Sequence, residues 1–141
     1  MKFINKVSVA DFIELHKAAA WKVLSAKEIK RSLKNSNFLV SSIEDGKAVG
    51  MARIVGDNAT HGLLCDVIVH PDYQHKGIGT AMVKYLMDRV QEFANKHDQY
   101  IVELLPTPGN REFYQKCGFK YLPDKMDGCY NWFKNQNIYK E

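Results

Sequence analysis

The sequence constrains the fold most tightly between Gly62 and Phe93, where a strand, a turn and a long helix follow one another. Residues Gly62 to Val69 are apolar almost throughout, which predicts a strand buried on both faces. His70-Pro71-Asp72 ends this strand, and a glycine-containing loop follows. Apolar residues then recur every three or four positions, which predicts an amphipathic helix packed on a sheet. They are Ile78, Met82, Leu86, Val90 and Phe93.

Capping and turn signals divide the rest of the chain into short helices and strands. Ser8 can cap one helix, and Ser25 with Glu28 has the spacing of a capping box for a second helix ending near Asn35. Asp45-Gly46 predicts a hairpin turn. We further expect strands at Lys2–Val7, Asn37–Glu44, Lys47–Val55, Tyr100–Leu105, Phe119–Leu122 and Cys129–Phe133, and a helix at Asn110–Cys117. This order predicts an α/β (α+β) fold, a mixed sheet flanked by helices, in a single domain of residues 1–141.

The net charge of +4 is mild and spread along the chain. The densest basic group is Lys27, Lys30, Arg31 and Lys34, which Glu28 interrupts, a pattern typical of a solvated helix face. A nucleic-acid surface needs a stronger basic stripe with stacking aromatic residues. No apolar segment has the length of a membrane span or the character of a signal sequence. We therefore expect neither a nucleic acid nor a membrane as partner.

Cysteine and histidine usage gives two further expectations. Cys65, Cys117 and Cys129 are an odd number of widely separated cysteines, which suits a reducing compartment and predicts a cytoplasmic protein. His16, His61 and His97 lack the spacing of metal ligands, so we expect no metal site.

The turn before the long helix is a candidate anion-binding site. Backbone amides in the first turn of a helix have no partner inside the helix and carry partial positive charge. Gly77 and Gly79 leave room for another group to approach these amides. A Walker loop would place Lys after the glycines, whereas Lys76 precedes them. A dinucleotide fingerprint would place a small residue where Met82 stands. An ordinary glycine-rich turn is the remaining alternative from the loop alone.

Two separate segments resemble the GNAT superfamily of N-acetyltransferases. Gln74-His75-Lys76-Gly77-Ile78-Gly79 matches the family's pyrophosphate loop, Gln/Arg-x-x-Gly-x-Gly/Ala. Arg111 to Phe119 resembles the family's Phe-Tyr-x-Lys-x-Gly-Phe segment. The two occur in the family's order, with a helix and a strand between them, and the resemblance covers about half the chain, from Leu63 to Phe119.

The resemblance implies a mostly antiparallel mixed sheet whose central strands, here Gly62–Val69 and Tyr100–Leu105, splay apart to form a cofactor cleft. It implies acetyl-CoA as cofactor, a β-bulge near Val67–Val69, and pantetheine contacts with the backbone of Val67, Ile68 and Val69. It also implies pyrophosphate contacts with Gln74, His75, Lys76, Gly77, Ile78, Gly79 and Thr80. The family often has Asn seven residues before the motif tyrosine, where this chain has Thr107, while Asn110 lies four before it and is the candidate contact here.

The resemblance also implies a catalytic role for Tyr114, as a general acid that protonates the departing thiolate and contacts the cofactor. Its alternative is a tyrosine that only packs the helix. Asp66, on the cofactor strand, is a candidate general base, and the equal alternative is a carboxylate that holds loop amides. Trp21, Phe38, Tyr130 and Trp132 are candidates for an acceptor pocket or for the core.

The function implied is transfer of an acetyl group from acetyl-CoA directly to a primary amine. Residues Pro123 to Tyr130 weakly resemble tails of small bacterial and plastid-type amine acetyltransferases, which favours a small-molecule acceptor. A protein or peptide acetyltransferase, and a non-catalytic acyl-CoA-binding module, stay open. A homodimer is compatible with the sequence.

Overall fold

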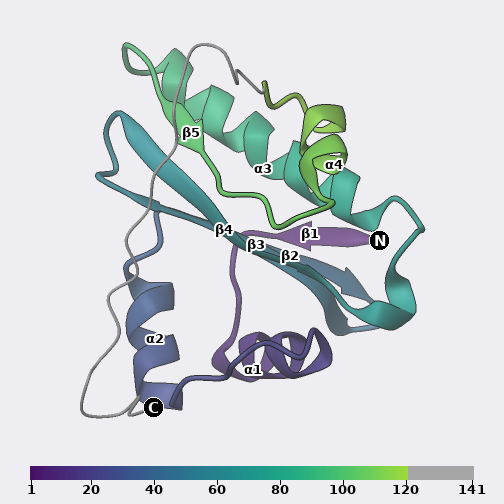
Figure 1. The fold of residues 1–141 in the computed structure, drawn as a ribbon. Coiled ribbons are helices and arrows are strands. Elements are labelled where there is room, and N and C mark those ends of the chain that lie inside the picture. Colours follow the sequence, from purple (N-terminus) through teal and green to yellow (C-terminus); the bar gives the residue numbers. More distant parts are fainter. Residues whose placement is uncertain (121–141) are drawn as a thin grey trace.

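A central sheet organises the part of the chain that the structure, a computed structural model, describes, residues 1–120 (Figure 1). Its five strands lie in the order β1-β2-β3-β4-β5. All neighbours pair antiparallel except β4 and β5, which are parallel. The predicted mixed, mostly antiparallel sheet is therefore confirmed. The strands are β1 Lys2–Ile4, β2 Phe38–Glu44, β3 Lys47–Gly56, β4 His61–Val69 and β5 Ile101–Glu103.

Local sequence signals explain how the first elements begin and turn. The side chain of Ser8 accepts a hydrogen bond from the Asp11 amide, at 3.0 Å, and caps the helix α1, Val9–Ala18. Ser25 caps the helix α2, Ala26–Lys34, in the same way, through the amide of Glu28. Such caps satisfy amide groups that a helix start leaves unpaired. The predicted hairpin turn at Asp45-Gly46 is confirmed, and both residues have positive φ, as a tight hairpin between twisted strands requires.

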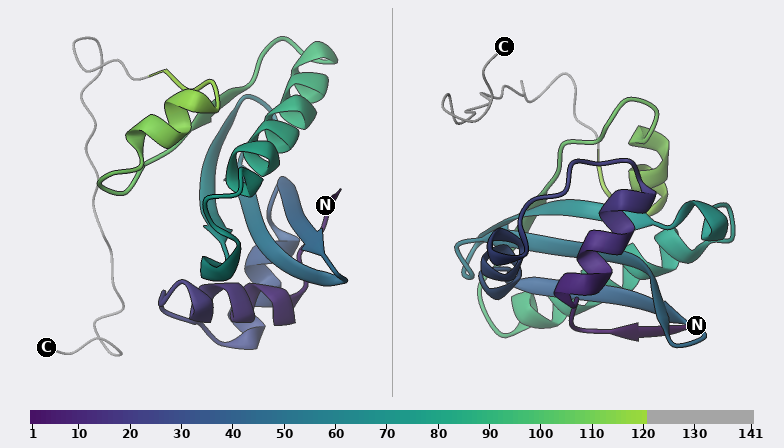
Figure 2. Two further views of the ribbon diagram at one scale, coloured as in Figure 1. Left: turned by 90° about the vertical axis from the view of Figure 1, so that its right-hand side faces the viewer. Right: turned by 90° about the horizontal axis from the view of Figure 1, so that it is seen from below.

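Helices cover both faces of the sheet (Figures 1 and 2). On one face, α1 Val9–Ala18 and α2 Ala26–Lys34 pack against β3 and β4. On the other face, α3 Ile78–Asn95 contacts β2, β3 and β4 and buries its predicted apolar stripe. A short 3-10 turn, η1 Pro71–Tyr73, joins β4 to α3, and α4 Arg111–Lys116 follows β5. No helix within residues 1–120 is long and apolar enough to cross a membrane.

Strands β4 and β5 separate after a short stretch of pairing. His61, Gly62 and Leu63 of β4 pair with Ile101, Val102 and Glu103, and β5 ends there. From Leu64 to Val69, β4 has no strand partner on that edge among the described residues. The splayed strands that the resemblance implied are therefore present (Figure 1).

The prediction that β4 is buried on both faces is wrong at Leu63, which is 38% exposed. Residues of β4 alternate between exposed and buried at the end that pairs with the short strand β5. An apolar run by itself does not show whether other elements cover both faces of a strand, and at this end of β4 only one face is covered. The predicted last strands, Phe119–Leu122 and Cys129–Phe133, lie outside the described residues except for Phe119 and Lys120.

A β-bulge interrupts β4 beside the opening. Met51 of β3 pairs with Ile68, and Arg53 pairs with Cys65, so Asp66 and Val67 together lie opposite Ala52. Asp66 has a φ of 52°, in the left-handed region that side chains rarely adopt. The predicted bulge is confirmed and lies at Asp66–Val67. A bulge bends its strand and redirects the following side chains, here toward the cleft.

Candidate active site

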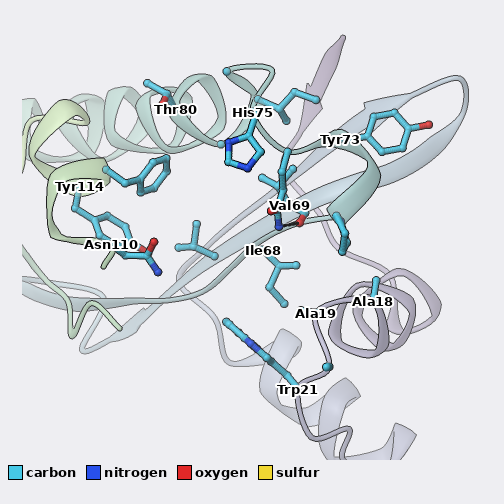
Figure 3. Close-up of a pocket in the computed structure, with 18 residues that line it drawn as sticks. Ala18, Ala19, Trp21, Ile68, Val69, Tyr73, His75, Thr80, Asn110 and Tyr114 are labelled. Atoms are coloured by element: carbon cyan, nitrogen blue, oxygen red, sulfur yellow. Dashed lines mark hydrogen bonds between the residues drawn. The ribbon is translucent and has the colours of Figure 1, made fainter. Parts of the chain in front are cut away.

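The opening between β4 and β5 leads into a cleft of about 640 Å³, a volume suited to a small-molecule site. Segments distant in sequence line it: the turn after α1, the end of β4, the loop before α3 and the start of α4 (Figure 3). Its lining includes most of the predicted cofactor contacts. They are Val67, Ile68, Val69, Gln74, His75, Gly77, Ile78, Gly79, Thr80, Asn110 and Tyr114.

The start of α3 presents unpaired amides to this cleft. Gly77 is the N-cap and provides no side-chain cap, and the helix has no acidic residue in its first turn. The first hydrogen bond into the helix runs from the Ala81 amide to the Gly77 carbonyl, at 3.1 Å. The amides of Ile78, Gly79 and Thr80 therefore precede the hydrogen-bonded part of the helix. Unpaired amides and the positive end of an 18-residue helix dipole together favour an anion.

The two loop glycines serve different purposes. Gly77 has a φ of 79°, and a Cβ built there would meet no atom within 4 Å, so the backbone conformation is what requires glycine. Gly79 has an ordinary φ, but a Cβ there would lie 3.3 Å from two ring carbons of Phe113. Gly79 thus allows α4 to pack closely on the start of α3. His75 also has positive φ, 62°, and its ring projects toward the cleft (Figure 3).

Two predicted phosphate contacts have side chains engaged elsewhere. Lys76 does not line the cleft, and its Nζ lies 5.3 Å from the centre of the Tyr73 ring. Cation–π attraction to this half-buried ring explains why the ammonium points away. Gln74 lines the cleft, but its Nε2 donates to the Val69 carbonyl, at 3.0 Å, and so ties the loop to the end of β4. The groups of this loop that are left to meet an anion in the cleft are therefore mainly backbone amides.

Val67, Ile68 and Val69 contribute to both the cleft and the core. Val67 and Val69 pack against the cluster on the α3 side of the sheet, and Ile68 is buried in the cluster under α1 and α2. Their backbone edge faces the gap left by β5. Such an edge can pair with an extended, amide-containing ligand as it would with another strand.

Tyr114 is half-buried on α4 and lines the cleft beside Asn110 (Figure 3). Its ring packs edge-on against Phe113 and Phe119. Its hydroxyl forms no hydrogen bond with residues 1–120. Burial, with a smaller effect of the Cys117 thiol, raises the pKa of Tyr114 above its ordinary value. A tyrosine in this state keeps its proton at neutral pH and can donate it.

Asn110 and Thr107, the two positions at which the chain departs from the family pattern, contact one another. Asn110 is exposed and lines the cleft, and its Nδ2 donates to Thr107 Oγ1 at 2.6 Å. Its carbonyl accepts a hydrogen bond from the Tyr114 amide. Asn110 therefore holds the start of α4, and Thr107 does not line the main cleft.

Asp66 does not line the cleft, which corrects the interpretation of this residue as the general base. Its carboxylate accepts hydrogen bonds from His16 Nε2, at 3.2 Å, and Arg53 Nε, at 2.5 Å. Burial alone would raise the pKa of Asp66, but these two partners outweigh burial and hold it below its ordinary value. A carboxylate bound in this way is a weak proton acceptor. The bulge, which strand alternation cannot foresee, turns it to the α1–α2 side.

Part of the lining was not predicted. Ala18, Ala19 and Ala20, at and after the end of α1, line the cleft, as do Pro71, Tyr73 and Phe113. The alanines carry no chemical signal in the sequence. Trp21 was a candidate and does line the cleft, at 43% exposure, opposite Tyr114 (Figure 3). Phe38 is instead a core residue, and Tyr130 and Trp132 lie outside the described residues.

Comparison with known proteins agrees with this geometry. A model of the Acetyltransferase (GNAT) family matches residues 4–119. The chain belongs to the GNAT family. An uncharacterized N-acetyltransferase ycf52 of Pyropia yezoensis is 28% identical over 133 residues, which is 92% of this chain and 74% of that protein. A histone acetyltransferase, TAP1, of Glycine max is 28% identical over 92% of this chain and 58% of its own length.

A solved GNAT family acetyltransferase from Streptococcus pneumoniae has the same architecture. It is 27% identical, with a TM-score of 0.71, and the match covers 94% of this chain and 96% of that one. The GNAT chain described here is accordingly an N-acetyltransferase that transfers an acetyl group to an acceptor.

Proposed function

We propose that this GNAT enzyme transfers the acetyl group of acetyl-CoA to a small primary amine. One observation carries the proposal. The unpaired amides at the start of α3, the free edge of β4 and the hydroxyl of Tyr114 all meet in one cleft. The donor carries phosphates, an extended arm with amides, and a thioester at the end of that arm. The helix amides suit its phosphates, the free edge of β4 suits its arm, and the Tyr114 hydroxyl suits its thioester.

The residues present fit such a donor. The amides from Gly77 to Thr80 would hold its pyrophosphate, with His75 beside them. The free edge of Val67, Ile68 and Val69 would pair with its pantetheine amides. Acetyl-CoA would supply an activated acetyl group on a thiol leaving group. Because the thiol departs readily, this chain needs to supply orientation and a proton and does not need a covalent nucleophile.

Tyr114 is the proposed general acid. Its hydroxyl keeps its proton at neutral pH and has no competing partner among residues 1–120. It can therefore donate to a departing thiolate placed in the cleft. No aspartate or glutamate lines the cleft among the described residues. We propose that the attacking amine loses its proton to water that enters through the open side of the cleft.

The lining supports a small acceptor with an apolar body. Ala18, Ala19, Ala20 and Trp21 form the side of the cleft opposite Tyr114, and Tyr73 lies nearby. An acceptor with several positive charges would require carboxylates to balance them, and the described lining provides none. The alternative acceptor is a protein or peptide, which the similarity to a histone acetyltransferase supports.

The test is a turnover assay with a panel of alkyl, aryl, polyamine, amino-sugar and peptide acceptors. We expect release of CoA with alkyl or aryl amines, and much slower release with peptides. In the same assay Tyr114→Phe should lower kcat by about 10²-fold or more, with nearly unchanged affinity for acetyl-CoA. Tyr85→Phe is the matched control, because its hydroxyl bonds Asn5 outside the cleft. Faster turnover of peptides would overturn the choice of a small amine, and wild-type kcat in Tyr114→Phe would overturn the acid.

A further inference from the structure

His16 and Asp66 join two sides of the cleft through hydrogen bonds that are buried or partly buried. His16, in the last turn of α1, is only 4% exposed. Its Nδ1 donates to the Phe12 carbonyl at 2.8 Å, and its Nε2 contacts Asp66 Oδ1 at 3.2 Å. Arg53 holds the other carboxylate oxygen, and its guanidinium also donates to Ser36 Oγ at 3.2 Å. Asp66 is thus the point at which α1, β3 and β4 are tied together.

The same histidine also holds the turn that lines the cleft. The His16 carbonyl accepts the Trp21 amide at 2.9 Å, and the two rings meet edge-on with centroids 5.6 Å apart. The turn is tight, because Ala20 has a φ of 57°. The direction of Trp21 therefore depends on where His16 lies. Phe12 stacks on the His16 ring, with the two ring centroids 3.8 Å apart, and leaves it little freedom.

Asp66 in turn lies immediately before the residues that form the opposite side. It is the left-handed residue of the bulge, and Val67 to Val69 follow it directly. A left-handed conformation of a residue other than glycine persists only where surrounding contacts hold it. The hydrogen bonds from His16 and Arg53 to its carboxylate are such contacts. One hydrogen bond, from His16 to Asp66, thus connects the Trp21 turn to the bulged edge of β4.

We propose that the His16–Asp66 bridge is a positioning device that sets the distance between Trp21 and the bulged strand, and so the acceptor end of the cleft. The proposal rests on the proposed function for its kinetic consequence. Neither residue lines the cleft, so neither is a catalytic residue. The loop before α3 is held separately, by η1 and by the bond from Gln74 to Val69. Loss of the bridge should therefore affect the acceptor much more than acetyl-CoA.

Two substitutions at one position separate the hydrogen bond from the packing. His16→Phe keeps a ring between Phe12 and Trp21 and removes the donor to Asp66. His16→Gln retains an amide donor that can reach Asp66 from a similar distance. We expect His16→Phe to raise KM for the amine about tenfold or more, and to change the Kd of acetyl-CoA less than twofold. His16→Gln should recover most of the loss. Ser8→Ala, which weakens α1 at its opposite end, is the matched control and should leave KM unchanged.

A second measurement does not depend on turnover. The chain has two tryptophans, so Trp132→Phe leaves Trp21 as the only one, and excitation selective for tryptophan reports on it alone. In that background, His16→Phe should make Trp21 fluorescence more sensitive to acrylamide quenching, and His16→Gln should restore the original value. Unchanged quenching in folded His16→Phe would overturn the proposal, as would equal losses of amine and acetyl-CoA affinity. If the wild type acetylates no amine, the proposed acceptor fails, and the quenching comparison still decides whether the bridge positions Trp21.

Discussion

Substitution of Gly79 by alanine tests whether close packing between α3 and α4 positions Tyr114. The new methyl would lie 3.3 Å from two ring carbons of Phe113 and 3.4 Å from Val69 Cγ2, so these neighbours must move by a few tenths of an ångström. Overpacking of this kind costs about 1–3 kcal/mol. Alanine in a helix regains about 0.5–1 kcal/mol relative to glycine. The net loss of stability should therefore be small, between about 0 and 2.5 kcal/mol.

The displacement should instead appear in catalysis. The helix α4 has six residues and none of them is buried, so it is free to shift when Phe113 is pushed, and Tyr114 shifts with it. Because a small misplacement of a reacting group lowers the rate strongly, we expect kcat to fall about tenfold or more while the protein stays folded. The assay is steady-state turnover at saturating acetyl-CoA, with a thermal melt of the same sample.

Two variants sharpen this test. Gly46→Ala, in the β2–β3 turn, places alanine at a φ of 77° with no atom nearby, so it should cost about 1–2 kcal/mol of stability and leave kcat unchanged. Adding Phe113→Leu to Gly79→Ala makes room for the methyl and should recover part of kcat. Wild-type kcat in folded Gly79→Ala would refute the argument that this contact positions Tyr114.

Three further predictions concern charge and protons. Gly77→Glu and Gly77→Lys impose the same backbone strain and differ in charge. We expect the Glu variant to bind acetyl-CoA about tenfold or more weakly than the Lys variant. Equal Kd values would contradict an anion site. Because the pKa of Tyr114 is raised from its ordinary value near 10, kcat/KM should rise with pH as the amine loses its proton, without a fall below about pH 10. A descending limb near neutrality would exclude Tyr114 as the acid. The pKa of Asp66 is depressed in the folded state, so its contribution to stability is complete above about pH 4 and is lost as the pH falls below that. Asp66→Asn should accordingly show a shallower loss of unfolding free energy between pH 4 and the acid transition in chemical denaturation.

The elements that could be predicted from the sequence depend on local physics. Ser8 and Ser25 cap the helices that follow them, and Asp45-Gly46 turns the hairpin, because each involves residues only three or four positions apart. The same holds for the amides around Gly77, since a helix start and its glycines are contiguous in the chain. These local features give the helix starts, the β2–β3 hairpin and the glycine-containing loop before α3.

The surroundings of Asp66 could not be predicted in this way. Its partners lie 50 and 13 residues away, at His16 and Arg53, and no periodicity joins them. The bulge also breaks strand alternation, so alternation gives no reliable side for the carboxylate. Lys76 was expected at the phosphate because of its place in the motif, but the ring of Tyr73 attracts its ammonium. Long-range packing decides the directions of these side chains.

The cleft presents its proposed donor with main-chain groups, the amides that begin α3 and the open edge of β4. An alanine scan removes side chains and leaves every one of these groups in place. Such a scan should therefore find few strongly affected positions along Val67–Val69 and Ile78–Thr80 and understate how much of the binding energy resides there. Replacing single amides by esters would delete one N–H at a time without altering any side chain. The affinity of this site is a property to be mapped by backbone chemistry.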